Sequence, residues 1–165
     1  MINESQTSLA PGAATLAAAV AAVSRVAHDG RSADVALQDA ESRADRAAVR
    51  AIALGTMRWY LRLAPALGSL VSRPAAEMDP LLRALLITAA HQIEYSRGAP
   101  EVSVHLAVDA ARALGLARAT GFVNAVLRRE SGAVISEEEF DNANKQYFPQ
   151  FGDEESEILQ KRQNR

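Results

Sequence analysis

The sequence contains no cysteine, and this absence excludes several kinds of chemistry from the chain. Without thiols, its 165 residues cannot form a disulfide, a thiolate zinc site or a cysteine nucleophile. The net charge is only −2, so the chain as a whole has no strong attraction to nucleic acid or to an anionic membrane. Any site for an anionic ligand must therefore be local.

The chain also has no long hydrophobic run and no signal-like start. Residues 13–27 are rich in alanine and valine, but the stretch is too short and too weakly hydrophobic to span a bilayer. Residues 1–12 lack the positive charge and the apolar core of a secretory leader. We therefore expect a cytoplasmic protein with no membrane partner, and the hydrophobic content of 48% indicates a folded domain.

Lysine is confined to the last part of the chain, where the composition changes. Residues 1–130 contain 32 alanines and 14 arginines against 12 acidic residues, which gives a net charge of +2. Residues 131–165 contain both lysines and carry a net charge of −4. The shift predicts an N-terminal extension over residues 1–12, a helical domain over residues 13–130, and an acidic tail over residues 131–165. This tail is a docked acidic helix, a disordered segment or sequence unrelated to the domain, and a docked tail would screen nearby arginines.

The first 130 residues contain helical patterns and no strand pattern. Apolar residues recur at a spacing of three or four, which is typical of helices with one buried face. The expected helix starts are Ser32, Asp45, Asp79 and Ser103, and the expected ends are Gly30, Gly115 and the Arg73-Pro74 pair. A separate short segment is expected at residues 67–71, and an apolar ridge at residues 122–127. Seven helical segments with short links predict an all-α bundle.

No catalytic set or metal site is visible in the sequence. His28 is predicted at a helix end, where an imidazole complements the helix dipole. His91 and His105 lie inside predicted helices, without cysteines or paired carboxylates at the spacing of metal ligands. No glycine-rich phosphate loop follows a strand. We therefore expect no metal, no cofactor and no enzymatic activity from this chain.

Arginine is the side chain that offers binding chemistry. Arg58 and Arg62 lie four residues apart beside Trp59, so both guanidinium groups can emerge on one face of a helix. The candidate RNA-binding arginines are Arg25, Arg31, Arg58, Arg62, Arg118, Arg128 and Arg129. Arginine binds phosphate bidentately and stacks on bases, but arginines at helix ends also interact with the helix dipole or with carboxylates. RNA binding requires these cations to converge into one exposed electropositive strip.

Four stretches, in order, resemble the NusB-like domain at the N-terminus of bacterial 16S rRNA cytosine-carbon-5 methyltransferases of the Sun or RsmB type. They are DRAAVRAIALGTMRWYLRL (45–63), SRP (72–74), DPLLRALLITAAHQIEYSRGAP (79–100) and GLARATGFVNAVLRR (115–129). The resemblance covers about residues 13–130. It implies an all-helical NusB-like bundle of about seven helices that binds RNA or protein partners and helps to place a ribosomal RNA substrate.

The resemblance adds Asn124 to the candidate RNA-binding residues. In the pattern of this family, Asn124 lies one turn before Arg128, which implies that the two side chains share a helix face. An amide and a guanidinium on one face can contact a base edge and a phosphate together. The alternative role for Asn124 is structural, as a side chain that ties down a neighbouring loop.

Two departures from the family limit what the resemblance implies. Antitermination factors of the NusB family begin with an arginine-rich first helix, whereas residues 13–24 here contain no basic residue. The S-adenosylmethionine-binding half of the methyltransferases is not found after residue 130, and methylation at cytosine carbon 5 needs a thiolate. We expect an RNA-binding module, and the resemblance to this family implies that the RNA it binds is ribosomal RNA. The alternatives are a transcription antitermination-type factor, or a protein-interaction or homodimer module in which the alanine-rich first helix docks another helix.

Overall fold

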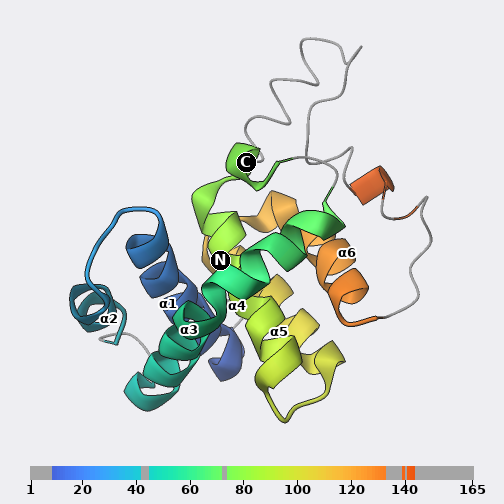
Figure 1. Ribbon diagram of the computed structural model, residues 1–165. Coiled ribbons are helices and arrows are strands. Elements are labelled where there is room, and N and C mark those ends of the chain that lie inside the picture. Colours follow the sequence, from blue (N-terminus) through green and yellow to red (C-terminus); the bar gives the residue numbers. More distant parts are fainter. Residues whose placement is uncertain (1–8, 42–44, 72–73, 133–138, 140, 144–165) are drawn as a thin grey trace, which may run out of the picture.

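The computed structural model describes residues 9–41, 45–71, 74–132, 139 and 141–143 (Figure 1). The helices are α1 (Pro11–Ala27), α2 (Ala33–Glu41), α3 (Arg46–Leu70), α4 (Pro80–Tyr95), α5 (Pro100–Ala113) and α6 (Thr120–Glu130), with short 3-10 helices η1 (Ala75–Glu77) and η2 (Ala117–Ala119). The described residues contain no strand, so the predicted all-α class is confirmed. Most of the predicted acidic tail, and residues 1–8 of the predicted extension, lie outside the described residues.

Aspartates begin two of the long helices, as the sequence predicts. The Asp45 carboxylate accepts hydrogen bonds from the backbone N–H groups of the second and third residues after it, at 3.1 and 3.2 Å. Asp79 accepts the equivalent pair at 2.9 and 3.1 Å, and Pro80 occupies the first helical position. Each cap satisfies N–H groups that have no partner inside the helix. Gly30 and Gly115 adopt positive φ angles of 67° and 76° after α1 and α5, which confirms these two predicted ends.

Two predicted boundaries are wrong. The helix predicted to open at Ser103 begins at Pro100, because proline fits the first helical turn, where its missing N–H is not needed. The segment predicted at residues 67–71 is the end of α3, which continues through Pro65. Pro65 lies on the exposed side of the helix, where water can satisfy the carbonyl of Leu61 that has lost its donor.

The core is built around α1 and α4. α1 packs against α2, α3, α4 and α5, and Leu16, Val20 and Val23 on this helix are buried. α4 is buried almost continuously from Leu82 to Ala90. The small side chains of α1 therefore allow close packing inside the domain. Ala13, Ala17, Ala19 and Ala22 are buried in this way, so this face of the helix is not available to dock the partner that the protein-interaction hypothesis placed on it.

The helices α2 and α6 lie at opposite ends of this core. α2 contacts α1 and α3, whereas α6 packs mainly against α5 and α4, and Figure 1 shows the two helices on opposite sides of the molecule. The apolar ridge predicted at residues 122–127 is buried through Phe122, Val123, Val126 and Leu127. Within the described residues, the structure contains no helix with the length and apolar character needed to cross a bilayer.

Candidate nucleic-acid interface

The candidate side chains fall into three groups on different helices. Arg25 and Arg31 lie at the end of α1 and in the link to α2, and Arg58 and Arg62 lie on α3. Arg118, Asn124, Arg128 and Arg129 lie on η2 and α6. Because α2 and the α1–α2 link lie on the side of the molecule away from α6, Arg25 and Arg31 do not join the α6 group in one strip. The expectation that all seven arginines converge is therefore wrong, and an RNA contact has to be made by a smaller group of them.

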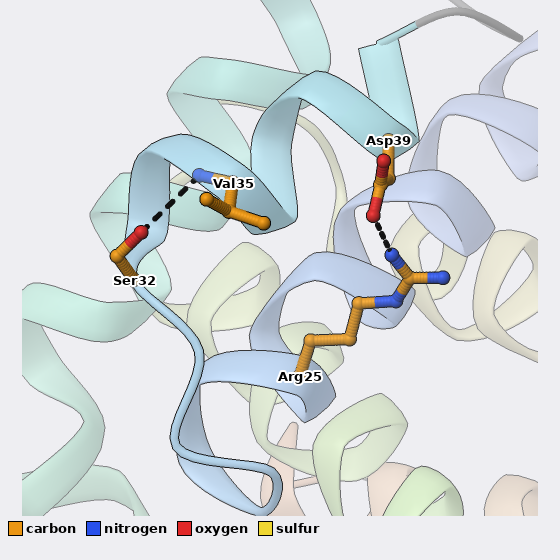
Figure 2. A network of polar contacts seen from close by, with 4 residues as sticks. All are labelled: Arg25, Ser32, Val35 and Asp39. Atoms are coloured by element: carbon orange, nitrogen blue, oxygen red, sulfur yellow. Dashed lines mark hydrogen bonds and ion pairs between the residues drawn. The ribbon is translucent and has the colours of Figure 1, made fainter.

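Arg25 connects two helices of the domain. Its guanidinium forms an ion pair with the Asp39 carboxylate of α2 (Figure 2). In the link between the helices, the backbone N–H of Arg31 donates to the carbonyl of Arg25 at 3.0 Å. The Ser32 hydroxyl accepts from the backbone N–H of Val35 at 3.4 Å, so Ser32 begins α2 as predicted. The charge of Arg25 is thus already balanced by a contact that holds α2 against α1.

Two members of the α6 group face a shallow pocket of about 270 Å³, whereas Arg118 and Arg129 do not line it. Asn124 and Arg128 both line this pocket, so they share a helix face as the resemblance implies. The other lining residues are Glu101, Val104, His105 and Ser131. One nitrogen of Arg128 lies 2.9 Å from a carboxylate oxygen of Glu139, in the short described segment beyond α6. This ion pair is a contact of the kind expected from a docked acidic tail.

The α3 group differs from the other two in having no acidic partner among the residues that the structure describes. Arg58 and Arg62 are exposed, and neither makes an ion pair with any residue that the structure describes. The Trp59 ring stacks on the Tyr95 ring of α4, with the ring centres 5.2 Å apart and the planes at 11°. The guanidinium carbon of Arg62 lies 5.7 Å from the centre of the Trp59 ring. Two arginines without an ion pair to any described residue therefore lie on α3 next to an aromatic pair, in which Trp59 and Tyr95 are each 38% exposed as whole residues.

A buried histidine packs against the Tyr95 ring of this aromatic pair. The His91 ring is 9% exposed and contacts Tyr95, with the ring centres 5.1 Å apart. Gly55 of α3 makes room for His91, because a Cβ atom at this position would lie 2.7 Å from the His91 Cε1 atom. Burial lowers the pKa of the His91 imidazole, and the Glu94 carboxylate partly opposes this shift.

Sequence reasoning did not find this assembly of α3 and α4. The available signal is a pair of matching spacings, since Gly55 and Trp59 are four residues apart, as are His91 and Tyr95. Four residues is about one helical turn, so each pair lies on one face of its helix. What the sequence does not show is that these two faces meet.

A carboxyl pair joins the ends of α4 and α6. Burial raises the pKa of Glu130, and a hydrogen bond and charge repulsion from Glu94 raise it further. The pair lies next in sequence to Tyr95 on one side and to Arg129 on the other. The end of α4 thus contacts α3 through the Tyr95–Trp59 stack and α6 through the Glu94–Glu130 pair. Within the described ranges, no cluster of three or more His, Asp or Glu side chains could hold a metal ion.

Comparison with protein families places this arrangement among known domains. The sequence model of the NusB family matches residues 14–131, which agrees with the range covered by the resemblance. The matched residues include all six α-helices except the first three residues of α1.

Curated relatives of the chain carry the name ribosomal RNA small subunit methyltransferase B. The protein from Xylella fastidiosa (strain 9a5c) is 37% identical over 94 residues, which cover 57% of this chain and 22% of the relative. The protein from Xanthomonas campestris pv. campestris is 35% identical over 124 residues, 73% of this chain and 28% of the relative. That from Pseudomonas syringae pv. tomato is 34% identical over 100 residues, 59% of this chain and 22% of the relative. The chain spans about a quarter of the length of these relatives.

Proposed function

We propose that this chain, which belongs to the NusB family, is an RNA-recognition module that binds RNA through the exposed face of α3. The observation that supports this most directly is that Arg58 and Arg62 stand about one turn apart without an ion pair among the described residues. An exposed arginine with no carboxylate partner can bind phosphate without first breaking a contact inside the protein. RNA offers a chain of phosphates at which both cations can act together.

Ribosomal RNA is the RNA class we propose. The support is the name of the relatives, which are ribosomal RNA methyltransferases, together with the position of the NusB-family match within this chain. In this proposal the domain holds the RNA in place and performs no chemical step. The arginines fix phosphates, and the pocket at Asn124 and Arg128 offers a second contact, in which an amide can reach a base edge beside a bound phosphate.

The test is the salt dependence of RNA binding by the full chain. Equilibrium titrations between 50 and 200 mM salt would compare the wild type with an Arg58→Gln, Arg62→Gln double variant, using a ribosomal RNA fragment. If each arginine neutralises one phosphate, the slope of log affinity against log salt becomes shallower by about 1.4 to 1.8 in the double variant. A wild type whose affinity does not change with salt would contradict the proposal.

Arg112→Gln is the matched control for this experiment. Arg112 on α5 is exposed, and its guanidinium already lies 2.9 Å from Asp109. The substitution removes a positive charge, as each α3 substitution does, but from a neutralised site. We expect its slope to equal that of the wild type, and a slope change as large as that of an α3 arginine would assign the effect to net charge alone.

A second candidate function is protein association through the same helix. Leu61 is 88% exposed and Leu54 is 41% exposed, and the spacing of seven residues places them on one face of α3. Exposed leucines beside arginines and a tryptophan are common in protein interfaces. Light scattering over a range of concentrations, with Leu61→Asp as the variant, would test it. A wild-type dimer that Leu61→Asp dissociates would support association, and a monomer at all concentrations would exclude self-association.

A further inference from the structure

We propose that Trp59 and Tyr95 form a stacking platform for an unpaired RNA base. This inference rests on the RNA binding proposed above and adds the class of ligand, which is a single-stranded segment. The two rings come from different helices and lie nearly parallel, with their centres 5.2 Å apart. Trp59 and Tyr95 are each 38% exposed as whole residues, so part of the pair can be reached by a ligand.

The platform is held in place before any ligand binds. Tyr95 is backed by the His91 ring at 5.1 Å, and His91 is in turn confined against the backbone of α3 at Gly55. A side chain larger than hydrogen at Gly55 would overlap the imidazole. Preorganised rings lose little conformational entropy when a base stacks on them, which is the condition for a useful binding surface.

In the free protein, the Arg62 guanidinium lies over the Trp59 ring. Its guanidinium carbon lies 5.7 Å from the ring centre, close to the outer limit of about 6 Å for a cation–π contact. The side chain is exposed and flexible, so an incoming base can displace it. The displaced guanidinium remains beside the site and can bind the phosphate of the same nucleotide. Arg58, one turn earlier on α3, is positioned for a neighbouring phosphate.

The chemistry of the site favours an unpaired nucleotide over other occupants. A base within a duplex is stacked on both faces and cannot reach a protein ring, whereas an unpaired base can. An apolar protein segment would cover the rings but would leave the charges of Arg58 and Arg62 without anionic partners. The acidic pair Glu94 and Glu130 lies at the end of α4, so the phosphates of the strand should run along α3 and away from that end.

Trp59 is the only tryptophan in the chain, which makes its fluorescence a direct reporter of the site. We expect a single-stranded oligonucleotide to quench this fluorescence and to protect it from acrylamide, and a duplex of the same composition to do neither. Binding would then be measured with labelled single-stranded RNA for Trp59→Leu and Trp59→Phe. Loss of the ring in Trp59→Leu should weaken binding by roughly 5- to 150-fold. Trp59→Phe keeps an aromatic ring and should retain most of the affinity.

Each result distinguishes the platform from the proposed function. If the wild type binds RNA with the expected salt slope but Trp59→Leu binds single strands equally well, the platform is overturned and RNA binding by the arginines stands. If the wild type binds no RNA, both proposals fail. Circular dichroism would check that the variants fold, and if Trp59→Leu does not fold, the wild-type acrylamide experiment decides alone. Protection of Trp59 by protein self-association without RNA would also overturn the platform.

Discussion

The α3 face and the α6 end carry the same kind of side chain in different surroundings. Arg128 is in the last turn of α6, where the helix dipole favours a cation, and Glu139 lies within 2.9 Å. Arg58 and Arg62 are in the interior of a 25-residue helix, beyond the reach of the dipole, and no described carboxylate pairs with them. The helix-end explanation for arginine therefore accounts for Arg128 and for Arg25, but it does not account for the α3 pair.

This comparison shows that the environment of an arginine is more informative than its count. Arg25 stabilises the contact of α1 with α2 through Asp39, and its sequence context gives no sign of that partner fourteen residues away. The α3 arginines instead lie beside an aromatic pair whose support comes from another helix. The α3 face therefore depends on the packing of α4.

The largest effect is expected from Gly55→Ala, which breaks the support of the α3 face. The new Cβ would lie 2.7 Å from the His91 ring, which is confined between Gly55 and Tyr95. Overpacking of this kind lowers the free energy of unfolding by about 1–3 kcal/mol, which exceeds the helix-propensity gain of up to about 1 kcal/mol. Urea denaturation would measure the change. The variant should also lose Trp59 quenching by single-stranded RNA.

Gly68→Ala is the matched control for this substitution. Gly68 is on the same helix, and nothing lies within 4 Å of a Cβ atom built there. Only the propensity gain remains, so Gly68→Ala should raise the free energy of unfolding by up to about 1 kcal/mol. Equal stabilisation by both substitutions would show that His91 yields easily and that the platform is not rigid.

A smaller effect is expected from acidification, which acts on the same support through His91. Burial lowers the pKa of His91 below its ordinary value of 6.5, so the unfolded chain takes up this proton before the folded chain does. The contribution of the neutral His91 to the free energy of unfolding is therefore complete above pH 6.5 and is lost as the pH falls below 6.5. Urea midpoints from pH 8 down to 5.5 should therefore decline in the wild type, and less steeply in His91→Gln.

The raised pKa of Glu130 has the opposite effect on the free energy of unfolding, and the two effects have to be measured separately. The folded chain protonates Glu130 before the unfolded chain does, so acidification toward its ordinary value of 4.5 favours folding. Keeping the measurements above that value limits this contribution, and a Glu130→Gln variant removes it. A decline that persists in full in His91→Gln would show that another group is responsible.

The sequence predicts the helical class well because the signals for it are local. Asp45 and Asp79 cap helices through their own neighbours, and the buried ridge of α6 repeats at helical spacing. The site was predictable only in part, because it depends on contacts between helices. Arg58 and Arg62 were identified from their spacing, but the Trp59–Tyr95 stack joins positions 36 residues apart, and no local pattern links them.

The smallest expected effect concerns the paired arginines, and it tests whether the α6 end also binds RNA. Glu139→Gln removes one acidic partner of Arg128, whereas Asp39→Asn removes the same charge from Arg25 at the opposite side of the molecule. Exposed ion pairs are worth at most about 1 kcal/mol, so RNA affinity should rise by no more than roughly fivefold in Glu139→Gln. Asp39→Asn should leave the affinity unchanged. Equal increases in both variants would mean that general charge controls binding, and no increase in either would leave an RNA contact at α6 without support.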